Sequence, residues 1–332
     1  MKTVALLPVA ALALALPPQE LSTRYQPERA LRVTSETTLS METTRSEFLR
    51  DGEPVEGRGG FGGGGSSETR KTVHVDRYLD CVEGRPTRMR RSWQEADAET
   101  EMNFGDQSRG FALESPFEDV VVEITSDEDG ELSYEVVEGS DPGQEALERL
   151  RPALALDALL PSGEVAEGDS WDLEGEAIAR GLGLDLADVL FARPDPGEGG
   201  GGGRGGGRGG RGGMRGGGGG LGQLARAEWS GQATFKGTGD REGVACAVIG
   251  LELEASSEMD GEGMTSVFEA ELSGELYVAL EGRRPVALEL EGSLRSEMDS
   301  ERERNGVVME SHRESEGTFE LTCLVEETDF EE

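Results

Sequence analysis

The stretch LRVTSETTLSM, residues 31–41, alternates between two kinds of side chain. Its odd-numbered positions are apolar or small, as at Leu31, Val33 and Leu39, and its even-numbered positions are polar or charged. Because successive side chains of a strand point to opposite faces, this pattern predicts a long strand with one face in water. Residues 286–294 follow the same rule. The two stretches together indicate a half-buried antiparallel sheet.

Turn-forming segments predict which strands are neighbours. Residues 119–125 and 131–137 flank SDEDG, whose Asp129-Gly130 pair suits a tight hairpin turn. Residues 229–235 and 244–255 flank GTGDREG, from which we expect a looser loop.

Two further stretches share one local pattern. LDCVEGRPTRMRRSW, residues 79–93, and YVALEGRRPVALELEG, residues 277–292, each give strand, Glu-Gly-Arg, proline and strand. The likeness suggests two related β halves, residues 24–140 and 223–328. Two copies of an ordinary hairpin turn are the safer explanation of this likeness.

The apolar period changes between these halves, in residues 141–195. Asp141-Pro142 is typical of the start of a helix, which we expect to run to residue 150. Pro152 disfavours its continuation, and residues 153–160 and 184–192 are further helical candidates, the last with Asp185 as a cap. These helices would cover one open face or end of the sheet, or, as an alternative, plug a curved sheet.

The predicted fold is therefore mainly β. Long antiparallel strands form a curved sheet, an open barrel or a sandwich, with two or three short helices between two β halves.

The first residues are typical of a secretory signal peptide. Lys2 precedes an apolar run, residues 4–16, and Ala13-Leu14-Ala15 offers the small residues that a signal peptidase requires. We expect residues 1–15 to be removed, which places the mature chain in the periplasm or outside the cell. The apolar run is shorter than the roughly 20 residues of a membrane span.

The chain carries a formal net charge of -36. Such a charge repels nucleic-acid phosphates, so we expect no nucleic-acid partner. The run EGGGGGRGGGRGGRGGMRGGGGGLG, residues 198–222, contains four arginines but almost no other side chains. It cannot bury enough surface to offset the cost of ordering its backbone, so residues 196–222 are predicted to be a disordered loop. The shorter run GRGGFGGGG, residues 57–65, is predicted to form a flexible hairpin tip.

Motifs for catalysis or cofactor binding are absent from the sequence. It has no GxSxG elbow and no phosphate-binding loop, and His74 and His312, its only histidines, have no metal-ligand spacing. Both histidines are expected at the surface. TSDEDGELSYEV has the wrong residues for a calcium loop, because Thr125 and Val136 fall where acidic ligands are required. No catalytic, cofactor-binding or metal-binding residue is predicted.

The cysteines and tryptophans are expected to serve the core. Three cysteines, Cys81, Cys246 and Cys323, lie in strand-like stretches. A disulfide between Cys246 and Cys323 is one option, and buried free thiols are the other. The tryptophans, Trp93, Trp171 and Trp229, are expected to pack in the core rather than to form a sugar-binding platform.

One segment, LLPSGEVAEGDSWDL, residues 159–173, resembles a pattern of uncharacterised exported bacterial β-rich proteins. The matched residues are Pro161, Val165, Gly168, Asp169 and Trp171. The resemblance implies an envelope location and a β fold, and it transfers no catalytic residue. In physical terms, Val165 would begin a short strand and Gly168-Asp169 a turn that lays Trp171 on apolar neighbours.

These observations predict a non-enzymatic exported envelope or secreted protein that binds an apolar ligand or a lipid in a curved β-sheet. Two alternatives remain. The chain could be a protein-interaction or structural module that uses exposed sheet edges, or a carboxylate-dependent hydrolase. The sequence does not indicate an oligomeric state.

Overall fold

The computed structural model describes residues 18–55, 64–104, 107–191, 220–261, 263–304 and 306–329. The predicted signal peptide, residues 1–15, lies outside the described residues. So does most of each glycine-rich run, residues 56–63 and 192–219.

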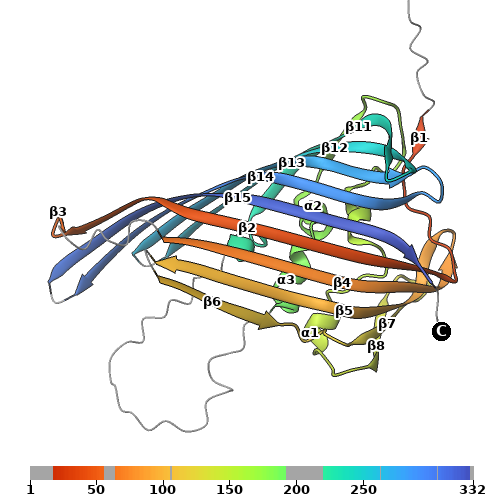
Figure 1. Cartoon of the computed structure of the whole chain (residues 1–332), viewed down its shortest axis with the longest axis horizontal. Coiled ribbons are helices and arrows are strands. Elements are labelled where there is room, and N and C mark those ends of the chain that lie inside the picture. Colours follow the sequence, from red (N-terminus) through yellow and green to blue (C-terminus); the bar gives the residue numbers. More distant parts are fainter. Residues whose placement is uncertain are drawn as a thin grey trace, which may run out of the picture.

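The molecule is built on one antiparallel sheet of 13 strands, in the order β10-β11-β12-β13-β14-β15-β2-β4-β5-β7-β8 (Figure 1). Two short strands lie off this path, with β3 paired to β2 and β6 paired to β5. β10 and β8 end the order and do not pair with each other, so the sheet is open. The predicted mainly β, antiparallel fold is confirmed. The strands are β2 (Arg29–Arg50), β3 (Glu53–Pro54), β4 (Gly64–Val82), β5 (Arg85–Phe104), β6 (Gln107–Glu114), β7 (Val121–Ser126), β8 (Leu132–Glu138), β10 (Ser170–Leu173), β11 (Glu228–Arg241), β12 (Val244–Gly261), β13 (Met264–Ala279), β14 (Arg284–Arg304) and β15 (Val307–Thr328).

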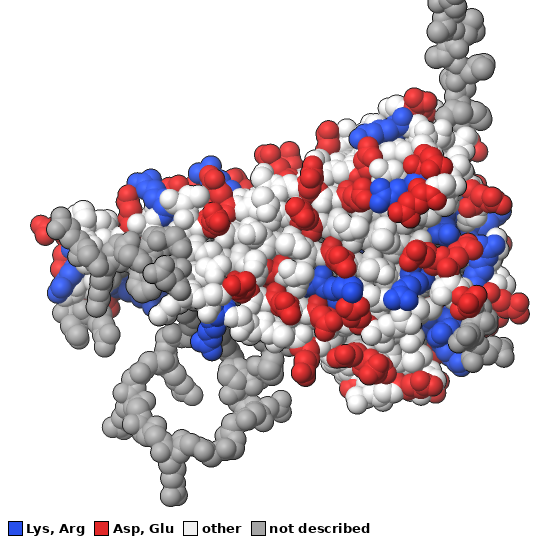
Figure 2. Space-filling model, viewed as in Figure 1, with Lys and Arg blue, Asp and Glu red and all other residues white. Residues whose placement is uncertain are grey.

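The predicted strand in residues 31–41 is the first part of β2. Leu31, Val33 and Leu39 are buried on its inner face, whereas Arg32 and Thr38 are exposed on the other face. The inner face packs against helices, and the outer face carries acidic and basic side chains in water (Figure 2). The alternation of the sequence therefore reflects one covered face and one wet face.

The predicted hairpins are formed, with one correction. β7 pairs with β8 across Gly130, which has a positive φ of 83°. β4 turns into β5 at Glu83 and Gly84, whose φ values of 51° and 79° suit a tight hairpin. The prediction of a loose loop over residues 237–243 is wrong. β11 continues to Arg241 and pairs with β12 on both sides of a β-bulge, which lies between Phe235 and Gly237.

The strands of both predicted halves belong to the same sheet. β15, near the end of the chain, pairs with β2 from Thr328↔Ala30 to Met309↔Arg50. The two groups of strands therefore share one continuous surface.

A small second sheet fastens the start of the described chain. β1 (Gln19–Glu20) pairs with β9 (Glu164–Val165). Gly168, at φ 91°, and Asp169 then form the expected turn into β10, and the Trp171 Nε1 donates to the Leu159 carbonyl at 3.2 Å.

In the described part of the chain, five short helical segments lie over the inner face of the sheet, and we call them the helical cover. Figure 1 shows helices of this cover behind the sheet. They are α1 (Gln144–Leu147), η2 (Ala155–Leu159), α2 (Gly175–Gly181), α3 (Leu184–Leu190) and α4 (Gly220–Leu224). Among them, η2 contacts β14, α2 contacts β11 and α4 contacts β2.

The predicted helix boundaries need correction. α1 starts after Gly143 and ends at Leu147, since Asp141 forms a turn by accepting from the Gly143 N–H at 2.8 Å. α3 starts after Gly183, so Asp185 lies inside the helix and is not its cap. α2 and α4 were not predicted, and α4 begins within the range assigned to the disordered loop. Its buried Leu221 and Leu224 supply the apolar contacts that the glycines before it lack.

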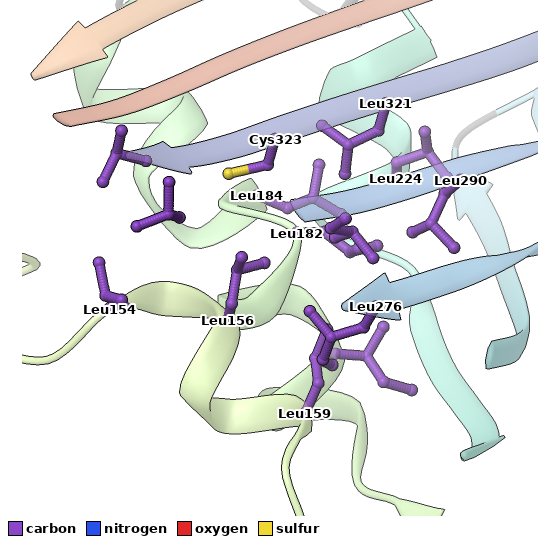
Figure 3. Close-up of a cluster of buried hydrophobic side chains, with 14 of the residues drawn as sticks. Leu154, Leu156, Leu159, Leu182, Leu184, Leu224, Leu276, Leu290, Leu321 and Cys323 are labelled. Carbon is purple, nitrogen blue, oxygen red and sulfur yellow. The ribbon is translucent and has the colours of Figure 1, made fainter. Parts of the chain in front are cut away.

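The core lies between the helical cover and the sheet. Figure 3 shows leucines of the cover facing leucines of the strands. The labelled side chains are Leu154, Leu156, Leu159, Leu182, Leu184 and Leu224 from the cover, and Leu276, Leu290, Leu321 and Cys323 from the strands.

The central strands approach one another closely at a glycine. An ideal Cβ on Gly274 of β13 would lie 1.9 Å from the Glu289 carbonyl oxygen of β14. A side chain has no room there. Glycine in a strand interior often marks such a close backbone approach.

Candidate ligand cavity

A cavity of about 410 Å³ lies between the sheet and the helical cover. Its floor consists of inward-facing residues of β15, β2, β4 and β5, and its roof consists of η2, α3 and the segments beside them. Small side chains occupy the middle of the floor. Ser35 of β2 faces Thr72 of β4 and Cys323 of β15 in register. Since larger residues such as Leu39 and Tyr78 fill the floor on either side, the small ones leave the space open.

Leucine and phenylalanine side chains make most of the roof apolar. Leu154, Leu156, Leu184, Leu190 and Phe191 line the cavity and are buried. The Phe191 ring also lies under a guanidinium from the floor, with the Arg70 Cζ 5.3 Å from the ring centroid.

One end of the floor carries a buried polar group of residues. The Arg91 Nε and Nη2 donate to the two oxygens of Asp76 at 2.6 and 2.7 Å, and both side chains are buried. His74 lies beside this pair, with its Nε2 3.8 Å from Asp76 Oδ1 and its ring 4.7 Å from the Trp93 ring. Burial, helped by the positive charge of Arg91, lowers the pKa of His74 to about 3. His74 is therefore neutral at physiological pH.

Several polar atoms at the cavity have no hydrogen-bond partner among the described residues. They are His74 Nδ1, Trp93 Nε1 and Arg70 Nη1, and all three side chains line the cavity. Arg70 is otherwise held by Glu68, to which its Nε and Nη2 donate at 2.8 and 2.6 Å. Buried polar atoms of this kind cost stability unless a ligand or an ordered water supplies a partner.

Asp157 connects the roof to the start of the chain. Its two carboxylate oxygens accept from the hydroxyls of Thr23 and Tyr25. The Tyr25 oxygen also accepts from the Leu154 N–H at 2.7 Å, and its ring packs 4.7 Å from the ring of Tyr78 on β4. Burial raises the pKa of Asp157 to about 6, against the smaller lowering effect of the two hydroxyls. Since both oxygens are engaged in fastening η2, Asp157 has a structural role at the cavity.

Arginines gather where the cavity meets solvent. Among its lining residues, Arg149 and Arg151 are exposed, and the Arg180 side chain is 38% exposed. Asp185 lies near enough to Arg180 and Arg151 that both lower its pKa, although burial raises that pKa overall. The opening is therefore more basic than the molecule as a whole.

Both histidines were predicted to lie at the surface, and the structure differs for His74. The surface position expected for His74 is wrong, because it lies under the helical cover with its side chain 12% exposed. His312 lies near the start of β15 and does not line the cavity. It contacts Glu314 at 2.9 Å and Asp299 at 2.7 Å, and these two carboxylates raise its pKa. The sequence did not reveal that Arg70, His74 and Arg91 share one cavity.

The expected roles of cysteine and tryptophan agree with the structure in most cases. All three cysteines are free thiols, so the alternative disulfide between Cys246 and Cys323 is not formed, and those two are buried. Trp93 and Trp229 are buried, and Trp171 is partly buried against the core.

Neither a metal cluster nor a membrane-spanning helix is found in the described part of the chain. No group of three or more His, Cys, Asp or Glu residues there could hold a metal ion. No helix among the described residues is long and apolar enough to cross a membrane.

Comparison with known proteins assigns the chain to no family. No family model matches it, and no curated protein matches it. Among solved structures, it is similar to one describing lipid–protein interactions in lipovitellin, at 7% identity and a TM-score of 0.36. The match covers 92% of this chain but only 26% of that one. A second similarity, to the outer membrane protease OmpT from Escherichia coli, covers 90% of this chain and 97% of that one at 10% identity, with a TM-score of 0.15. Both TM-scores are low, so neither similarity bears on function, and the resemblance over residues 159–173 stays a prediction.

Proposed function

We propose that this protein binds an apolar or amphipathic small molecule, such as a lipid, between its sheet and its helical cover. The observation that carries the proposal is the cavity of about 410 Å³, lined mostly by apolar side chains from both layers. Sites for small molecules are typically concave, largely apolar and about 300–1,000 Å³ in volume.

The hydrophobic effect supports this function. Because the cavity opens to solvent, its apolar lining is accessible to water until a ligand covers it. Covering apolar surface is favourable by about 25 cal/mol per Å². An apolar molecule bound in the cavity would gain this free energy.

The local sequence also supports a space that is meant to be filled. The inward pair Ser35 and Thr72 lies directly opposite across β2 and β4, at the middle of the floor. Larger apolar residues at these two positions would close the cavity, and strands favour such residues. The small polar side chains therefore maintain a volume that simple core packing would fill.

The proposal includes a location outside the cytoplasm, which rests on the predicted signal peptide in residues 1–15. The mass of the protein recovered from cells tests it, because removal of those residues shortens the chain by a defined amount. An intact leader on the recovered protein would contradict export.

The decisive experiment loads the purified, delipidated protein with a total lipid extract and identifies retained molecules by native mass spectrometry. The test variant, Ser35→Leu with Thr72→Leu, narrows the cavity at the middle of its floor, and we call it the filled variant. The matched control, Thr38→Leu with Thr69→Leu, changes another opposed pair on the same two strands, but on the exposed face.

We expect similar amounts of lipid on the wild type and on the control, and less on the filled variant. The filled variant should be at least as stable as the wild type in urea, since filling a cavity commonly adds about 0.5–2 kcal/mol. A wild type that retains no apolar molecule, or a filled variant that retains as much as the wild type, would overturn the proposal.

A further inference from the structure

The charges around the cavity are opposite in balance to those of the whole chain. The protein has a net charge of -36, yet the cavity lining contains arginines at five positions and aspartates at only two. The arginines are Arg70, Arg91, Arg149, Arg151 and Arg180, and the aspartates are Asp157 and Asp185. An acidic molecule that gathers positive charge at one opening favours a negatively charged ligand there.

The two arginines of the floor are already neutralised. Arg91 forms a buried bidentate pair with Asp76, and Arg70 pairs with Glu68, whose side chain is 7% exposed. With His74 neutral, the interior of the cavity carries no net positive charge toward a ligand. This part of the cavity suits the uncharged portion of a molecule.

The three arginines at the opening are not neutralised in this way. The Arg149 guanidinium has no hydrogen-bond or ion-pair partner among the described residues, and only the backbone N–H of this residue donates, to the Ala146 carbonyl at 3.3 Å. Arg151 donates to the carbonyls of Glu148 and Leu150 at 2.7 and 2.8 Å and forms no ion pair among the described residues, although Asp185 lies near enough for the two charges to attract. Arg180 pairs with Glu176, but that side chain is 84% exposed, and such surface pairs contribute little.

We propose that the ligand is an anionic amphiphile, with its apolar chain in the cavity and its carboxylate or phosphate head on Arg149, Arg151 and Arg180. This inference rests on the proposed function and names the chemical class of its ligand. Guanidinium groups suit such heads because they donate two parallel hydrogen bonds to a carboxylate or a phosphate. A neutral or cationic head gains nothing from these three groups.

The test compares probes that share one alkyl chain and differ in the head. The four ligands are palmitate, hexadecyl phosphate, hexadecanol and hexadecyltrimethylammonium. The assay measures how tightly each one competes with N-phenylnaphthylamine, an uncharged fluorescent dye, for the delipidated full-length protein. We expect the better of the two anions to bind at least about tenfold more tightly than hexadecanol, because a hydrogen bond to a charged group contributes more than one between neutral groups. The better anion also distinguishes a fatty-acid head from a phosphate head.

The variants remove charge at the opening without touching the apolar chain. Arg149→Gln alone should lower the affinity for the better anion severalfold and leave hexadecanol unchanged. Adding Arg151→Gln and Arg180→Gln should abolish the preference for the anion. Arg149 is the first choice, since its guanidinium makes no hydrogen bond or ion pair with the described residues, whereas Arg151 also caps α1.

A control variant applies the same change of charge elsewhere. Arg32, Arg45 and Arg295 are exposed on β2 and β14 and do not line the cavity, and their replacement by Gln should leave the preference intact. Added salt should weaken binding of the anions but not of hexadecanol. Equal binding of hexadecanol and the anions would overturn this inference while leaving the proposed function standing. Failure of all four probes to bind would overturn both.

Discussion

Asp157→Asn tests whether burial of one carboxylate makes the attachment of the helical cover dependent on pH. The Asp157 carboxylate fastens η2 to Thr23 and Tyr25, and burial raises its pKa from 3.8 to about 6. The folded chain therefore holds this proton more tightly than the unfolded chain does.

The sign and size of the effect follow from that shift. Below about pH 4 Asp157 is protonated in both states, and its contribution to stability is fully present. As the pH rises the unfolded chain releases the proton first, so this contribution is lost as the pH passes through about 6. A shift of this size corresponds to about 3 kcal/mol of unfolding free energy.

The assay is urea denaturation followed by tryptophan fluorescence, at several pH values from about 4 to about 7, where linkage places the change. The unfolding free energy of the wild type minus that of Asp157→Asn should fall by about 3 kcal/mol over this range, because asparagine does not titrate. The exposed Asp260 supplies the control, since Asp260→Asn makes the same chemical change away from the helical cover. A constant difference for Asp157→Asn would refute the reasoning, since it would mean that burial does not perturb this carboxylate.

Two further predictions concern the sheet. Gly274→Ala should lower the unfolding free energy by roughly 1–3 kcal/mol, because a Cβ there would overlap the neighbouring strand, whereas Gly110→Ala on open β6 should be near neutral in the same urea titration. Asp76→Asn should cost about 3–5 kcal/mol by leaving the Arg91 charge buried without its partner, and adding Arg91→Met should restore most of the loss. An Asp76→Asn protein as stable as the wild type would show that water already solvates this pair.

The sequence predicted the sheet where one face of a strand is apolar and the other is wet. In β2 this condition holds from Leu31 to Leu39, and alternation alone identified the inner face. The hairpin turns were predictable because Gly84 and Gly130 have positive φ values, a backbone conformation that glycine adopts most easily.

The same reasoning fails in β4. Val73 and Val75 are buried, but they lie on the face away from the cavity, while Arg70, His74 and Asp76 face inward. Alternation would place the valines inside and His74 in water. The inner face of β4 is polar because its charges pair within the sheet, and that pairing depends on partners in β5 that no local pattern reveals.

The sequence predicted that the curved sheet binds an apolar ligand, but not which residues form the cavity. Its floor joins Ser35, Thr72 and Cys323, which are distant in the chain and meet only through strand register. A small residue in a strand has the same local appearance whether it leaves room for a ligand or packs under a neighbour. The three arginines of the opening are equally indistinct in sequence, because arginine supplies nearly all of the basic side chains of this chain.

The position of β15 in the sheet determines when the strands on either side of it can pair during folding. β15 (Val307–Thr328) lies between β14 and β2, so β2, which is synthesised long before β15, lacks one neighbour until β15 is made. A ribosome-bound chain that has not yet released this segment exposes two long strand edges at once, and such edges invite pairing with other chains. The middle of the sheet therefore forms late, and it forms slowly because its strands are distant in sequence. Until β15 is made, the exposed edges of β14 and β2 must be kept from pairing with other chains.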